Sequence, residues 1–227
     1  MLIDLRNATV EEFTTALFDH TPREELEDKP WYFADDLHFV VEPERQVANM
    51  TAVLEHAGNL IDRYSSPQIE EGLWCMIGGC WFDEFFGHAW NPSIALEPRL
   101  AAIDSIYFLY DQLLAARPFE SIHFRHPDLL PRRFANIDYM VTDLMLLGRG
   151  RDRPTADARR LRDACLRVFV RLLHHPAPVA QYSALHGLGH LNRAKGRAEI
   201  ALYIAQHDDL SEDQLEYAHD AMRGDVL

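Results

Sequence analysis

The chain has 227 residues, of which 48% are hydrophobic, and its formal net charge is −14. This length and composition are enough for one large domain or two small ones with a hydrophobic core. No apolar run approaches the roughly 18 residues of a membrane helix, and the N-terminus MLIDLRNATVEEF lacks a signal pattern, so we expect a soluble cytoplasmic protein without a membrane partner. Acidic side chains are concentrated at the start of the chain, where residues 1–70 carry 15 acidic and 5 basic side chains. This segment repels nucleic acid and would attract a basic partner.

Helical periodicity begins near the N-terminus and dominates the first half of the chain. Asn7 or Thr9 is expected to cap a first helix, because both side chains accept hydrogen bonds from backbone N–H groups. Apolar residues at three- and four-residue spacing predict one long helix over residues 43–64. A further helix is expected to start at Ser66 and to end or bend at the pair Gly78-Gly79.

The same pattern continues with another long helix, expected over residues 98–116, and a further helix over residues 132–147. The helices late in the chain are short to medium in length and are expected over residues 155–174, 178–192, 196–207 and 211–223. No strand alternation is found, so the predicted fold class is all-α. Links of two to five residues favour antiparallel helical pairs, stacked as a HEAT-like α-solenoid or a compact helical bundle. We expect a single domain over 1–227, with possible sub-parts 1–147 and 155–227.

Three cysteines, Cys75, Cys80 and Cys165, are present. An odd number without CxxC spacing argues against a disulfide framework and against a structural zinc site. We expect free, buried thiols that pack as small hydrophobic side chains.

Histidines are concentrated in residues 174–191, HHPAPVAQYSALHGLGHL. On a helix, His186 and His190 lie one turn apart, on the face opposite the apolar stripe that contains Leu188. Two interpretations remain open: the pair ligates a metal with the help of further ligands, or it lines a polar groove or hydrogen-bonds to the next helical layer. The pair lacks the Glu of HExxH. We therefore expect no cofactor, and His186 and His190 are the only metal candidates.

The segment HPAPVAQYSALHGLGHL resembles the helix of a HEAT-type repeat, in which a turn with Pro precedes small and aliphatic residues. The resemblance covers about residues 155–207. The segment YSSPQIEEGLWCMIGG (64–79) is similar to a pattern in uncharacterised bacterial helical proteins that also end in Leu-His-Gly-Leu-Gly-His. The resemblance to HEAT-type proteins implies a scaffold that binds other macromolecules along a curved surface.

One enzymatic branch of the HEAT-type proteins, the di-iron deoxyhypusine hydroxylases, carries its iron ligands in His-Glu dipeptides. This chain contains no His-Glu dipeptide, since Gly187 follows His186 and Leu191 follows His190. The resemblance therefore implies the scaffold and does not extend to that chemistry.

An aromatic cluster spans residues 74–90, WCMIGGCWFDEFFGHAW. These rings either pack in the core or form an exposed platform for a partner, since Trp and Phe often anchor interfaces. On the surface, the neighbouring acids would make the platform suited to a basic protein. The candidate partner-binding residues are Asp35, Asp36, Asp83, Glu84, His88, Trp90, His186 and His190.

No nucleophile elbow, phosphate-binding loop or dinucleotide fingerprint is present, and we assign no catalytic residue. The pattern favours a non-catalytic protein-binding module, an inhibitor or immunity-type protein that neutralises a basic toxin or effector. Two alternatives stay open. One is a metal-dependent hydrolase or oxygenase that uses His186, His190 and a carboxylate from the front half, and the other is a scaffold or regulatory subunit. The oligomeric state is not determined by the sequence.

Overall fold

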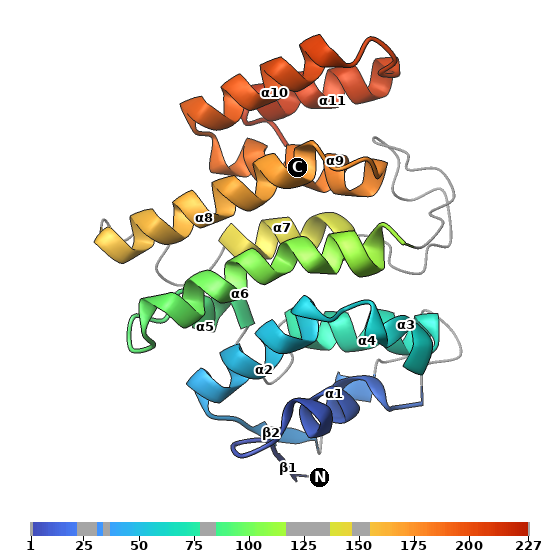
Figure 1. The fold of residues 1–227 in the computed structure, drawn as a ribbon, viewed down its shortest axis with the longest axis vertical. Helices are drawn as coiled ribbons and strands as arrows, with labels where there is room; N and C mark the ends of the chain where they lie inside the picture. Colours follow the sequence, from blue (N-terminus) through green and yellow to red (C-terminus); the bar gives the residue numbers. More distant parts are fainter. Residues whose placement is uncertain are drawn as a thin grey trace.

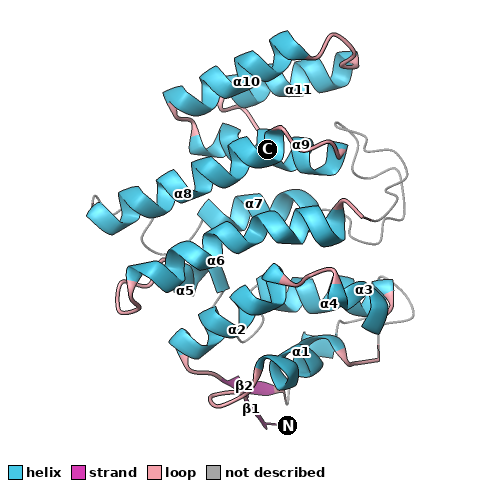
Figure 2. Cartoon of the chain, viewed as in Figure 1, coloured by secondary structure: helices cyan, strands magenta, loops and turns pink. Residues whose placement is uncertain are grey.

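The computed structural model describes residues 2–21, 31–33, 37–77, 85–116, 137–146 and 155–226, and helices make up most of it (Figures 1 and 2). The predicted all-α class is confirmed. Within the described part of the chain, no helix combines the length and the apolar character needed to cross a bilayer.

The helices follow one another along the chain with short links wherever the link is described. The α-helices are α1 (Val10–Phe18), α2 (Pro43–Glu55), α3 (Asn59–Arg63), α4 (Ser66–Ile77), α5 (Phe85–Ala89), α6 (Leu96–Leu109), α7 (Ile137–Leu146), α8 (Ala156–Leu173), α9 (Pro178–Leu191), α10 (Ala194–Gln206) and α11 (Glu212–Arg223). A 3-10 turn, η1 (Trp31–Phe33), and a π-helical turn, η2 (Tyr110–Leu114), complete the helical elements.

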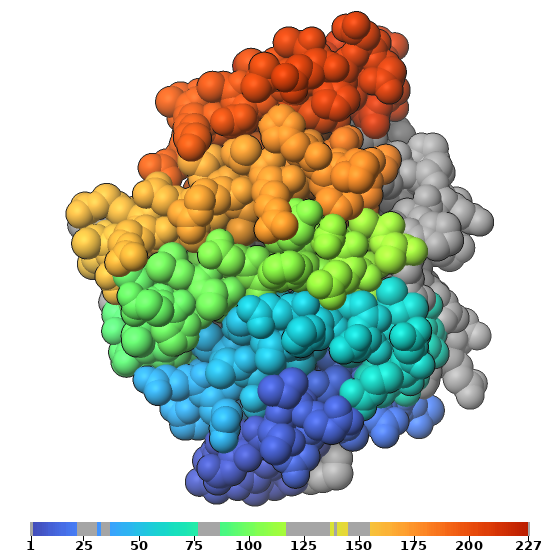
Figure 3. Space-filling view, viewed as in Figure 1, coloured from blue at the N-terminus to red at the C-terminus, as the bar shows by residue number. Residues whose placement is uncertain are grey.

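The helices stack in chain order from the N-terminal end of the molecule to α10 and α11 (Figure 1). One row is formed by α2, α6, α8 and α10, and a second row by α4, α7, α9 and α11, each helix packing on the next in its row. The pairs α8–α9 and α10–α11 join the two rows. In the space-filling view the same order appears as successive bands across the molecule (Figure 3).

Several helices begin where side-chain capping predicts. Thr9 caps α1 in a reciprocal arrangement with Glu12, which confirms one of the two expected caps. Thr155 caps α8, and Ser211 caps α11 with Gln214. Each of these side chains satisfies a backbone N–H that the first helical turn leaves unpaired.

The long helix expected over residues 43–64 is wrong, because it is broken at residues 56–58 into α2 and α3. The side chain of Gln112 from η2 spans the break. Its amide nitrogen donates to Glu55 O at 3.2 Å, and its amide oxygen accepts from Gly58 N at 3.3 Å. A side chain distant in sequence thus satisfies backbone groups that an unbroken helix would have paired internally.

A short parallel strand pair, β1 (Leu2–Asp4) with β2 (His38–Val40), was not expected. Three residues are too few for a visible alternation of polar and apolar side chains. The pair lies at the N-terminal end of the stack, next to α1 (Figure 1).

Helix α9 occupies a central position, because it packs against α7, α8, α10, α11 and η2. Its glycines permit close approaches of neighbouring side chains. A Cβ at Gly187 would lie 2.7–2.9 Å from ring carbons of Phe169 on α8. A Cβ at Gly189 would lie 2.7 Å from the side chain of Val226, where the chain returns from α11. These contacts fix how α9 presents its remaining face to α7 and α11.

The substitution Gly187→Ala should destabilise the protein by about 1–2 kcal/mol, because Phe169 is fully buried and its ring has no space to retreat. The matched control is Gly58→Ala, whose Cβ would lie 3.5 Å from Gln112, an ordinary contact, and should change stability by less than about 0.5 kcal/mol. Urea unfolding of both variants measures the difference. Equal stabilities would contradict the tight α8–α9 packing.

Candidate functional site

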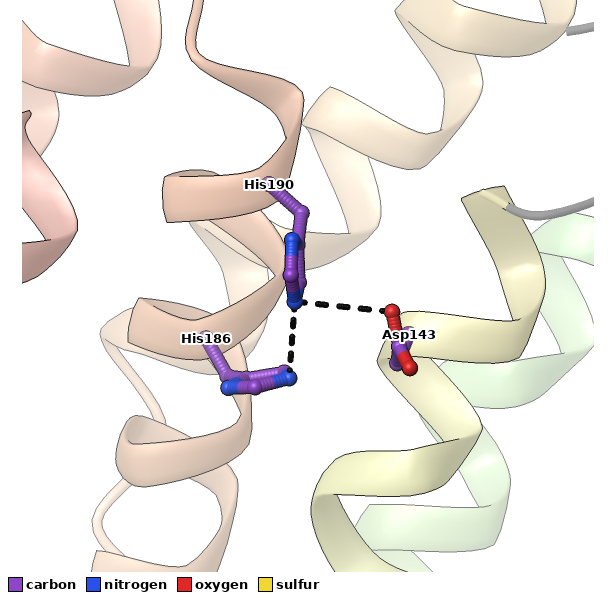
Figure 4. Close-up of side chains that lie close together, drawn as sticks. All are labelled: Asp143, His186 and His190. Carbon is purple, nitrogen blue, oxygen red and sulfur yellow. Dashed lines mark hydrogen bonds and ion pairs between the residues drawn. The ribbon is translucent and has the colours of Figure 1, made fainter. Parts of the chain in front are cut away.

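Three side chains with metal-ligating atoms meet where α7 packs against α9 (Figure 4). His186 and His190 project from the same face of α9, one turn apart. Their Nε2 atoms lie 3.0 Å from each other, and His190 Nε2 lies 3.4 Å from Oδ1 of Asp143 on α7. One ligand atom from each residue lies within 4.8 Å of the other two.

The position of Asp143 follows from the packing of α7. Val141 and Thr142, immediately before it, are fully buried. Asp143 lies at the edge of this contact, where its side chain is 21% exposed. The carboxylate therefore faces the histidines of α9 while keeping some contact with solvent.

A fourth side chain, Tyr217 of α11, holds His186 from its other side. The Tyr217 hydroxyl lies 2.8 Å from His186 Nδ1. The Tyr217 ring in turn packs on Tyr182 of α9, with ring centroids 4.7 Å apart. Both nitrogens of the His186 ring are thereby engaged, one toward α11 and the other toward His190.

His186 is the most buried member of the cluster, with 1% of its surface exposed. Burial, and to a smaller extent the neighbouring His190, lower its pKa to about 4. His186 is consequently a neutral imidazole at neutral pH. When its Nδ1–H donates to the Tyr217 hydroxyl, the lone pair of Nε2 points into the cluster.

The cluster is suited to two kinds of chemistry. Without a metal, His190 Nε2–H can donate to His186 Nε2 or to the Asp143 carboxylate. With a metal, imidazole nitrogens and a carboxylate oxygen match the ligand preferences of zinc and related transition ions. Donor atoms around a tetrahedral zinc lie about 3.3 Å apart, close to the two distances that join these three side chains.

The sequence placed His186 and His190 opposite the core face of their helix, and the structure shows that neighbouring helices pack against this face as well. Neighbouring helices cover α9 on several sides, so the face that carries the two histidines is a second interface between helices. Of the two histidines, only His190 has a partly exposed side chain, at 29%. Of the two interpretations of the histidine pair, the structure contains the hydrogen bonding: His186 bonds to Tyr217 of the neighbouring helix α11 and to His190. The same geometry also supplies the carboxylate from the front half that the metal interpretation required.

His88 and Trp90 are buried, His88 within α5 and Trp90 directly after it. Trp90 belongs to the hydrophobic core. Core packing is confirmed for this part of the aromatic cluster, and an exposed platform at His88 and Trp90 is wrong, because α5 is covered by α2 and α6. The other four candidate partner-binding residues, Asp35, Asp36, Asp83 and Glu84, lie outside the described residues.

Free buried thiols are confirmed for Cys75 and Cys165, and Cys80 lies outside the described residues. Burial raises the pKa of Cys165 to about 12. The Cys165 thiol is therefore protonated and unsuited to act as a nucleophile.

Asp143 and Tyr217 are members of the cluster that the sequence did not identify. Periodicity indicates that each lies on a helix beside buried positions. It does not indicate which helices become neighbours, and that information is needed to join either residue to the histidines of α9.

Comparisons with known proteins add no assignment: no family model, no curated protein and no solved structure matches the chain.

Proposed function

We propose that this protein is a helical-repeat protein that binds a divalent transition metal through Asp143, His186 and His190. The observation that carries the proposal is the convergence of two imidazole nitrogens and a carboxylate oxygen from two packed helices. Zn²⁺ fits this mixed nitrogen and oxygen donor set best among redox-inactive ions.

The protonation of the cluster supports metal binding. A histidine must be neutral to ligate a metal, and His186 is neutral well below pH 7. Binding therefore does not require removing a proton from the most buried ligand.

The surroundings of the cluster support it as well. Metal-bound histidines usually donate their second ring N–H to a neighbouring acceptor, which fixes the orientation of the ring. Tyr217 occupies that position at His186 Nδ1. Because Asp143 comes from α7 and the histidines from α9, a bound metal would cross-link two helices of the same row and stabilise the folded state.

Purified protein dialysed against Zn²⁺ should retain one zinc per chain by elemental analysis and should melt at a higher temperature than the chelator-treated protein. The double variant His186→Ala, His190→Ala should lose both the metal and the shift in melting temperature. The matched control, His174→Ala with His219→Ala, removes two exposed histidines and should retain both.

Zinc content below one tenth of an equivalent in the folded wild-type protein would contradict metal binding. Equal zinc retention by the two double variants would show that the metal is bound elsewhere.

Protein binding is the second candidate function, supported by the stack of helix pairs. Stacked helical repeats present extended surfaces along which other macromolecules bind, and the resemblance of residues 155–207 to HEAT-type repeats points the same way. The excess of acidic side chains in residues 1–70 favours a basic partner. Within this function we propose an inhibitor or immunity-type role against a basic toxin or effector, with a scaffold or regulatory subunit as the alternative.

Tagged protein should retain a basic protein in near-equal amount at low salt and release it as the salt concentration rises. Reversing the charges of Asp35, Asp36, Asp83 and Glu84 to Lys should lower the salt concentration needed for release. The control reverses Glu212 and Asp213, exposed acids at the start of α11, and should leave the elution profile unchanged. Identical profiles for both variants would contradict binding through the acidic front half.

A further inference from the structure

We infer that a metal at Asp143, His186 and His190 keeps one coordination position open toward solvent, where it binds water or a small monodentate anion. The inference rests on the proposed metal binding and concerns what the metal can do once it is bound. An open coordination position is typical of catalytic metal sites, whereas structural metal sites are closed by protein ligands.

The number of protein donors is the first argument. Structural zinc sites are closed by four protein ligands, whereas catalytic sites have three and leave the fourth position to water or substrate. Among the described residues, the cluster contains three donors and no further His, Cys, Asp or Glu.

Tyr217 does not supply the fourth ligand, although it contacts the cluster. Its hydroxyl is hydrogen-bonded to Nδ1 of His186, while the converging nitrogen of the same ring is Nε2. These two nitrogens point away from each other across the imidazole ring. Tyr217 is thus a positioning residue that orients the ring.

The distribution of exposure is the second argument. His186, at 1% exposed, closes the inner side of the cluster. His190 and Asp143 retain 29% and 21% of their side-chain surface in contact with solvent. These two residues therefore form the solvent-facing side of the cluster, and we expect a fourth ligand to enter there.

The chemistry of such a position follows from the charge of the metal. A divalent ion with two neutral imidazoles and one carboxylate has a net charge of about +1, which attracts small anions. Zinc in comparable sites lowers the pKa of its bound water to about 7. The expected fourth ligands are water or hydroxide, and exogenous anions such as azide compete for the same position.

Cobalt(II) substitution tests the inference, because the visible absorption of Co²⁺ reports its ligands and geometry. The full chain, stripped with a chelator and loaded with one equivalent of Co²⁺, should show intense visible bands typical of four coordination. Titration with sodium azide should shift these bands and saturate at one azide per cobalt. Sodium perchlorate at the same ionic strength, as a non-coordinating control, should leave them unchanged.

The outcomes separate the two claims. Strong cobalt bands that azide does not alter would overturn the open position while metal binding stands. If the folded wild-type protein retains no cobalt by elemental analysis, the proposed metal binding itself fails, and the inference with it. Retained cobalt with only weak visible bands would contradict the four-coordinate site. The variant His190→Ala, treated identically, should lack the bands and the azide response, which excludes cobalt bound elsewhere on the chain.

Discussion

The packing of α9 against α7, α8, α10 and α11 determines how the C-terminal helices are arranged and where the cluster lies. Gly187 lets the Phe169 ring of α8 lie against the α9 backbone, and Gly189 accommodates Val226 from the end of the chain. With these two sides packed, His186 and His190 face α11 and α7, where they meet Tyr217 and Asp143. The cluster is therefore a consequence of close packing at two glycines, where a larger side chain would push the helices apart.

Polar groups in such an interface need partners, because an unpaired buried imidazole costs free energy. The cluster meets this need with residues from three helices: Asp143 from α7, the two histidines from α9 and Tyr217 from α11. An interface built for stability alone would be filled more simply by aliphatic side chains. Partly exposed ligands on one side and a fully buried ligand on the other are instead an arrangement suited to binding an ion that enters from solvent.

Much of the fold could be predicted from the sequence, because helix periodicity and caps are local properties. Thr9, Thr155 and Ser211 mark helix starts that the structure contains. The break at residues 56–58 could not be predicted, because the side chain that supports it, Gln112, lies more than fifty residues away. The site could be predicted only in part. The i, i+4 spacing indicated that His186 and His190 are neighbours, but tertiary packing brings Asp143 and Tyr217 to them. Whether the face opposite Leu188 is open to solvent could not be predicted for the same reason, since it depends on the neighbouring helices that cover α9.

The most direct test of metal binding is an anomalous-difference map from crystals of the protein grown with Zn²⁺, with data collected on both sides of the zinc absorption edge. The account predicts one strong peak about 2.0–2.2 Å from His186 Nε2, His190 Nε2 and an Asp143 carboxylate oxygen. A map without a peak at this position, with His190 still hydrogen-bonded to His186, would contradict it and leave the cluster a structural feature of the α7–α9 interface.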